Sequence, residues 1–286
     1  MNREWSETNK KMQSLLKKDT FSDGISELIG LRSILMNEIN SWRSVLVPED
    51  YWQMPFINAE GYHSKTIAYS IWHIMRIEDI VVNSLIQDKT EVLFSGGFDK
   101  SIKSDIITTG NELVKNELAA FSRQLDLAEL HRYAQSVKET TDTWLMSIRY
   151  DDLKRTFTDA DKNRLRSLHV VSIDKNAEWL IDYWCNKDIK GLIQMPLSRH
   201  WIMHIEAANR IKEKLEKIFL KLENDEDLTF EEAWKDKSMR DDIKEMSIEA
   251  NGYFLDPKYL FESLVHKVNV NEFTVEDLKE GIKAIR

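Results

Sequence analysis

The sequence predicts an all-α fold built as a helical bundle. The chain of 286 residues holds 9 glycines and 4 prolines, so it has few places for the tight turns of a many-stranded β fold. Hydrophobic residues make up 42% and charged residues 31% of the chain, which is ordinary for a globular protein with a sizeable core. Apolar residues also recur at three- and four-residue spacing over long segments, the pattern of amphipathic helices.

Three parts of the chain are predicted from composition. Residues 1–21 form a polar leader of mixed charge, and residues 22–224 form the helical bundle. A strongly charged stretch follows, and shorter helical patterns come after it. Residues 225–286 are therefore expected to be a small appendage of extra C-terminal helices.

The first half of the bundle contains two long predicted helices. Residues 22–46 carry apolar side chains at helical spacing, and Pro48 ends that helix. Residues 65–86 are apolar around most of the helix circumference, which places this second helix deep in the protein. A turn at 95–98 and a further helix over 104–125 are expected next.

The second half contains the longest predicted helices. Residues 127–153 form one of them; a charged connection and a short helix over 176–189 follow. Gly191 and Pro196 bracket a predicted loop. The last helix of the bundle then runs to Leu222.

This last helix carries a pair of histidines on its core side. Its apolar seam consists of Leu197, Trp201, His204, Ala208, Ile211, Leu215, Ile218 and Leu222. His204 occupies a seam position, and His200 lies one turn earlier beside the seam. One helical turn rises about 5.4 Å, so side chains four residues apart can converge on one point. The pair is either a set of hydrogen-bonded core histidines or part of a metal site.

His73 favours the metal site. It lies in the middle of the most apolar helix, where an imidazole without a partner would be costly to bury. A metal ion shared by His73, His200 and His204 would satisfy all three rings. Three imidazoles leave open positions on the ion, as in catalytic zinc sites. The remaining histidines are weaker candidates: His63 lies in a loop, and His131, His169 and His266 are expected on the surface among charged neighbours.

Several other kinds of site are excluded by the residues present. A zincin needs a glutamate after its first histidine, and Trp201 follows His200. A di-iron bundle needs two Glu-x-x-His pairs, and Glu60 with His63 is the one pair at that spacing. Cys185, the single cysteine, cannot form an intramolecular disulfide. It has no histidine nearby in sequence, so a structural role is favoured over a nucleophilic one.

Charge and hydropathy limit the partners. The formal net charge of −9 argues against a nucleic-acid partner, which needs a basic surface. No window of the sequence is apolar enough to cross a membrane, and the N-terminus lacks the apolar core of a signal peptide. A cytoplasmic protein is the expectation.

The histidine pattern resembles the DinB-like superfamily, also described as DinB/YfiT-like metalloenzymes. The residues that carry the resemblance are the stretch WHIMRIED around His73 and the His-x-x-x-His pair of His200 and His204. The order of elements is similar too, over about residues 22–222. The resemblance implies a four-helix bundle with up-down-down-up connections. It also implies a divalent metal, zinc or nickel, held by these three histidines.

The resemblance also implies an activity. Characterised members use a low-molecular-weight thiol such as bacillithiol or mycothiol, so a thiol-dependent S-transferase or a hydrolase acting on a small-molecule substrate is expected. A homodimer is common in the superfamily. This sequence departs from many members after His204, where Ile205, Glu206 and Ala207 replace a second histidine followed by Arg and Gly. This departure leaves the substrate open.

Two further questions stay open at this point. Glu78 and Glu206 could orient the ligand imidazoles, and Arg76 could hold a substrate carboxylate, although such residues on helices more often face water. The alternative function is that of a non-enzymatic helical stress-response or partner-binding protein, whose histidines bind metal weakly or not at all.

Overall fold

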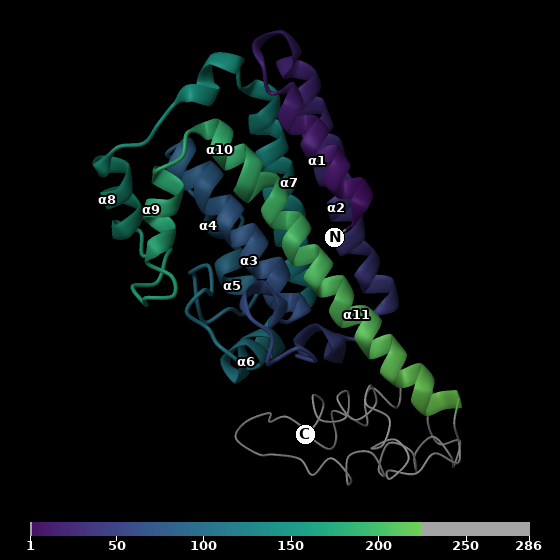
Figure 1. The fold of residues 1–286 in the computed structure, drawn as a ribbon. Coiled ribbons are helices and arrows are strands. Elements are labelled where there is room, and N and C mark those ends of the chain that lie inside the picture. Colours follow the sequence, from purple (N-terminus) through teal and green to yellow (C-terminus); the bar gives the residue numbers. More distant parts are fainter. Residues whose placement is uncertain (1, 225–286) are drawn as a thin grey trace. The chain divides into compact units, whose positions relative to one another are not determined.

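The chain is all-helical over the part that the structure describes. The computed structural model describes residues 2–224, and the side chains of residues 2–215. Every regular element in this range is a helix (Figure 1), which confirms the all-α prediction. No helix in this range has the length and apolar character that crossing a bilayer requires. The predicted appendage at 225–286, with His266, lies outside the described residues.

Eleven α-helices follow one another in the described residues. In order, they are α1 (Arg3–Leu15), α2 (Phe21–Val45), α3 (Ile67–Asp79), α4 (Val92–Ser95), α5 (Phe98–Ser101), α6 (Asn116–Gln124), α7 (Leu127–Ser147), α8 (Asp159–Ser167), α9 (Trp179–Cys185), α10 (Ile189–Gln194) and α11 (His200–Asn224). Two π-helical segments adjoin the long helices. Ile80–Ile86 continues α3, and Met195–Arg199 leads into α11.

The described residues divide into two compact units. The first comprises residues 2–42, 68–114 and 124–206, and the second comprises 43–67, 115–123 and 207–224. The three predicted metal ligands all belong to the first unit. In the second unit, Thr66 and Ser122 share a buried hydrogen bond of 2.6 Å, and Arg210 contacts Nδ1 of His63 at 2.6 Å.

The predicted polar leader forms helix α1 and packs against α2. The side chain of Asn2 caps the helix by accepting a hydrogen bond from the backbone N–H of Trp5. Met12 and Leu16 are fully buried. Gly24 allows close approach of the two helices, because a Cβ there would lie 3.1 Å from the backbone of Leu15.

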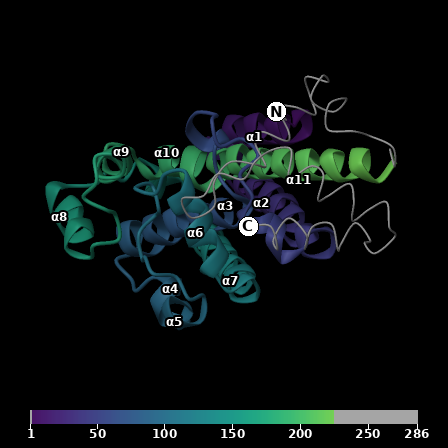
Figure 2. The same ribbon diagram turned by 90° about the horizontal axis from the view of Figure 1, so that it is seen from below.

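Helix α3 is the buried centre of the first unit, as the sequence predicts. Each of its residues from Ala68 to Asp79 is buried, and so is the whole π-helical segment that follows it. Core residues of α1, α2, α7, α9 and α10 surround this segment. Figure 2 shows α8 and α9 side by side in this unit, where Lys162 and Asp182 form an ion pair of 2.9 Å.

The helix predicted over 104–125 is wrong for its first half. A helix forms at Asn116–Gln124, whereas residues 104–115 are irregular. Gly110 and Lys115 have positive φ angles of 76° and 47°, which a right-handed helix excludes. Carbonyls of this segment also accept hydrogen bonds from side chains of α3, so they are not available to a helical ladder.

The loop predicted around Gly191 and Pro196 is wrong, because this stretch is helical. Residues Ile189–Gln194 form α10, and Met195–Arg199 form a widened π-helical turn. Proline lacks the backbone N–H of a regular helix, so Pro196 fits a turn in which the hydrogen-bond ladder is interrupted.

The charged connection after α7 likewise contains a helix, α8. Its N-terminus is capped by Thr158, with Asp161 three residues later.

Candidate metal centre

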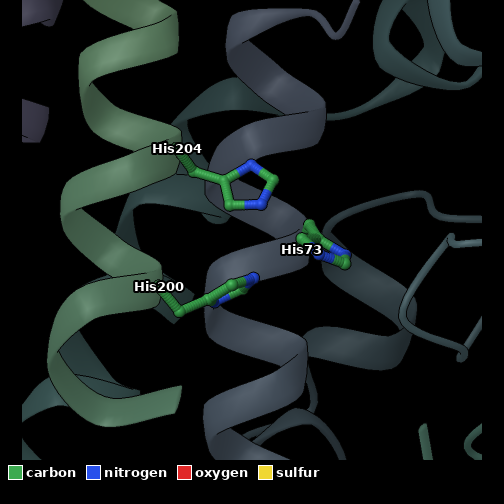
Figure 3. Close-up of side chains that lie close together, drawn as sticks. All are labelled: His73, His200 and His204. Atoms are coloured by element: carbon green, nitrogen blue, oxygen red, sulfur yellow. The ribbon is translucent and has the colours of Figure 1, made fainter. Parts of the chain in front are cut away.

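Three buried histidines meet between α3 and α11. His73 comes from α3, and His200 and His204 come from successive turns of α11; their rings face one another (Figure 3). The ring centroids lie 4.6–5.0 Å apart. The three residues are 5%, 8% and 4% exposed, respectively. The structure thus brings together the three residues that the sequence selected.

The spacing of the ring nitrogens suits a metal ion after small side-chain movements. One nitrogen of each ring lies within 4.8 Å of the others. Two nitrogens bound to the same tetrahedral zinc ion lie about 3.3 Å apart, given Zn–N bonds of about 2.0–2.1 Å. Small rotations of the imidazole rings would bring the three nitrogens to the distances that a bound zinc ion requires. Three buried histidines could therefore coordinate a divalent cation here.

The tautomer of His73 follows from its hydrogen bond. Nδ1 of His73 lies 2.8 Å from the backbone carbonyl of Thr109. A carbonyl oxygen can only accept, so Nδ1 carries a proton, and in the neutral ring Nε2 then keeps the lone pair that a metal needs. The ring of Tyr69 stacks on His73 with centroids 5.2 Å apart and planes at 14°, which restricts the imidazole further.

His200 stays neutral in this environment. Burial, with the neighbouring His73 as a lesser cause, holds the pKa of His200 well below its usual value. Its Nδ1 is buried and has no hydrogen-bond partner among the described residues. A buried nitrogen without a partner costs free energy, and a metal ion at this place would remove that cost. The donor set therefore fits a divalent cation that prefers imidazole ligands.

The sequence pattern of α11 explains how its histidines reach the site. The seam residues Leu197, Trp201, His204, Ala208, Ile211 and Leu215 are all buried, as predicted. Trp201, next to His200, donates its indole N–H to Glu78 of α3 at 2.8 Å. This bond and the packed seam fix the rotation of α11 about its axis, and with it the direction of both histidines.

Glu78 has a different partner from the one considered from sequence. Its carboxylate receives two hydrogen bonds from Arg32 of α2, at 2.6 and 2.7 Å, and it is fully buried. Arg32 also binds Asp142 of α7 at 2.7 Å and lies 4.7 Å from the centre of the Trp201 ring. Burial by itself lowers the pKa of Arg32, but the two carboxylates outweigh it and hold that pKa above its usual value. Glu78 therefore contacts α11 through the indole of Trp201, and this contact helps to orient the helix.

Arg76 is also fully buried and already paired. It binds Glu91 at 2.8 Å, the hydroxyl of Tyr133 at 3.2 Å and the carbonyl of Ile107 at 2.7 Å. Asp79 lies beside it and accepts a hydrogen bond from Tyr133 at 2.9 Å. These partners occupy the guanidinium, so it does not hold a substrate carboxylate in this arrangement. The expectation that Arg76 and Glu78 face water is wrong as well, because two buried ion-pair networks enclose them.

Within the first unit, Glu206, His131 and His169 do not belong to the histidine cluster. Glu206 accepts a hydrogen bond from the backbone N–H of Asn2. His169 is exposed, as predicted. His131 is buried at 3% exposure, so its predicted surface position is wrong. Its place one turn before the buried Ala134 decides this, rather than the charges of its sequence neighbours.

Cys185 is a buried free thiol. Burial raises its pKa to about 11, so little reactive thiolate exists near neutral pH. The structural role favoured by the sequence agrees with this.

The sequence interpretation missed the segment that holds His73 in place. Residues 104–115 supply the carbonyl of Thr109, whereas the sequence predicts a helix over this segment. Gly110 was the available signal, because a glycine inside a helical pattern marks a weak point in the prediction.

Comparisons with known proteins identified no relative of this chain. Protein-family models, curated proteins and solved structures all gave no match to this chain.

Proposed function

We propose that this chain is a metal-dependent enzyme of the DinB-like type, with a divalent cation, zinc or nickel, held by His73, His200 and His204. The observation that supports this most is the convergence of three buried imidazoles from two helices distant in sequence. Buried imidazoles gathered without a shared partner would each carry a desolvation cost. A common cation gives one physical reason for placing all three together.

The proposed bundle consists of α2, α3, α7 and α11 in up-down-down-up order. Its support is the network around Arg32 of α2, whose neighbours come from the other three helices: Glu78 of α3, Asp142 of α7 and Trp201 of α11. A buried arginine needs this number of partners to offset the loss of water. The same network holds α3 and α11 in the register that brings the histidines together.

The proposed reaction is a thiol-dependent S-transfer or a hydrolysis on a small-molecule substrate. A divalent cation at such a site supplies Lewis acidity, which makes a thiol or a water molecule nucleophilic at neutral pH. The chain's own residues prepare the site. Thr109 accepts the Nδ1–H of His73, and burial keeps His200 neutral, so the ring of His200 presents a lone pair without first losing a proton.

Metal content tests the proposal directly. The protein is purified without a polyhistidine tag, and metals are counted by inductively coupled plasma mass spectrometry. We expect about one zinc or nickel ion per chain, and loss of that ion in His73→Ala and His200→Ala variants. His169→Ala is the matched control, because His169 is exposed and lies outside the cluster.

Circular dichroism keeps the result interpretable by showing that each variant remains helical. Metal-free wild-type protein that takes up no added zinc, with an unchanged melting temperature, would contradict the proposal. It would favour the alternative, a non-enzymatic stress-response or partner-binding protein.

Thiol consumption tests the reaction class. The zinc-loaded protein is mixed with a low-molecular-weight thiol and an electrophile such as monochlorobimane, and conjugate formation is followed by fluorescence. An S-transferase accelerates the conjugation, and the His204→Ala variant does not. Equal rates with wild type and variant would remove S-transfer to this electrophile from the proposal.

A further inference from the structure

Three consecutive backbone carbonyls point at α3 beside the metal centre. Residues Ile107–Gly110, which we call the carbonyl strap, lie in the irregular segment before α6. Arg76 donates to the carbonyl of Ile107 from Nη2 at 2.7 Å and from Nε at 3.1 Å. Trp72 donates its indole N–H to the carbonyl of Thr108 at 3.0 Å. His73 donates from Nδ1 to the carbonyl of Thr109 at 2.8 Å.

The donors to the strap are rigid and lie close together. Trp72 and Arg76 are four residues apart on α3, so they share one face of the helix with His73 beside them. Both are fully buried. Glu91 and Asp79 hold the guanidinium of Arg76. The positions of the Ile107 and Thr108 carbonyls are thus set by side chains that do not belong to the histidine cluster.

We propose that the carbonyl strap is the positioning element of the metal centre, and that it selects Nε2 of His73 as the metal-binding nitrogen. The Thr109 carbonyl acts on His73 directly, and Arg76 and Trp72 act through the strap by fixing where that carbonyl lies. A neutral imidazole free in water prefers its proton on Nε2. In that tautomer Nε2 has no lone pair and cannot bind the metal. The hydrogen bond to Thr109 reverses that preference.

The strap also responds to the metal. A cation on Nε2 makes Nδ1–H a stronger donor, so the bond to Thr109 strengthens when the metal binds. Linkage requires the reverse as well: a strap held in place raises metal affinity by the same factor. This part rests on the proposed metal function, whereas the tautomer of His73 in metal-free protein does not.

Gly110→Ala is the variant that displaces the strap. Gly110 has φ of 76°, and an added Cβ would lie 2.8 Å from Cε2 of the buried Tyr69. Gly97→Ala is the matched control. Gly97 has a similar φ of 71°, but an added Cβ there meets nothing within 4 Å. Both variants place an alanine at a positive φ angle, but only Gly110→Ala adds a steric clash.

Trp72→Phe is the second variant, and it introduces no added atom that would push the strap away. It keeps an aromatic ring in the core and removes the donor to the Thr108 carbonyl. It also covers the case in which Gly110→Ala fails to fold.

The tautomer is measured by long-range nitrogen–proton NMR of the histidine rings in metal-free protein at pH 8. We expect the Nδ1–H form of His73 in wild type and Gly97→Ala, and a mixture of the two forms in Gly110→Ala and Trp72→Phe. Zinc affinity is measured on the same proteins by competition with a chelator. Loss of a hydrogen-bond partner behind a metal ligand typically weakens binding about 10–100-fold, and we expect that range for the two strap variants.

Two results would overturn the inference: an Nε2–H form of His73 in the wild type, or wild-type tautomer and affinity in both strap variants. A change in stability without a change in tautomer would also reduce the strap to a merely structural role. The two proposals fail separately. A wild type with the expected tautomer that binds no metal refutes the metal function and leaves the strap's effect on His73 standing.

Discussion

At the scale of single residues, burial decides which groups of this protein are reactive. His200 is kept neutral and Cys185 is kept protonated by the same physical cause, the loss of water around the charged form. The consequences are opposite. A neutral imidazole is a competent metal ligand, whereas a protonated thiol is a poor nucleophile.

Cys185 should resist alkylation in the folded protein. With a pKa of about 11, about one thiol in a thousand is ionised at pH 8, and the side chain is 4% exposed. We expect iodoacetamide to modify native protein at least tenfold more slowly than protein unfolded in urea, as followed by mass spectrometry. Burial raises the pKa, so the native rate should keep increasing up to about pH 11. Equal native and unfolded rates at pH 8 would show that the thiol is accessible.

At the scale of elements, capping side chains determine where several of the helices begin. Asp126 starts α7 by accepting a hydrogen bond from the backbone N–H of Glu129 at 3.2 Å. Asp188 does the same for α10, through Gly191 at 2.7 Å. The carbonyl strap has the opposite effect, because it delays the start of a helix. Its carbonyls bond to α3, so α6 begins only at Asn116.

Asp126→Ala should destabilise the protein by about 1 kcal/mol, the usual cost of removing an N-cap acceptor. The measurement is urea unfolding followed by circular dichroism at 222 nm. Asp126→Asn is the matched control, because it keeps the acceptor oxygen and removes the charge that faces Lys103 at 3.4 Å. Equal losses in both variants would assign the effect to the ion pair rather than to the cap.

At the scale of the whole molecule, the first compact unit encloses two ionic networks around α3. One centres on Arg32 with Glu78 and Asp142, and the other on Arg76 with Asp79 and Glu91. Buried ion pairs contribute little net stability, but breaking one leaves a charge without compensation. These networks therefore set how the helices pack, and the position of the histidines depends on them.

Arg32→Met should lower the free energy of unfolding by about 3–5 kcal/mol, because Glu78 would remain charged and buried without its partner. Chemical denaturation measures the loss. The double variant Arg32→Met with Glu78→Gln should recover part of it, since the orphaned charge is then gone. Arg3→Met is the control, as Arg3 pairs with Glu7 on the exposed face of α1 and should change stability by less than about 1 kcal/mol. A small loss in Arg32→Met would show that water reaches Glu78.

Zinc should stabilise the folded protein if the proposed site binds it. At a free zinc concentration one hundred times the dissociation constant, binding adds about 2.7 kcal/mol. A domain of this size then gains about 5–10 °C in melting temperature, which differential scanning fluorimetry detects. The His204→Ala variant should gain less than wild type. An equal gain in the variant would place the binding elsewhere on the chain.

The long helices and the histidine cluster were predictable because their signals are local. Apolar spacing gave α2, α3, α7 and α11 to within a few residues, apart from the first turn of α11 and the last turns of α3 and α7. His73, His200 and His204 stood out because an imidazole in an apolar helix needs a partner. Periodicity could place the three histidines on the buried sides of their helices, and the tertiary structure shows that these sides meet.

The sequence by itself therefore determined the helical class and the candidate ligands. The tertiary structure decided the partners of the buried charges and which nitrogen of His73 donates to the backbone. Those choices depend on contacts such as His73 with Thr109, 36 residues apart, and Arg32 with Glu78, 46 residues apart. Helical periodicity describes neighbours within one turn or two, and it carries no information on which distant carbonyl or carboxylate will meet a given side chain.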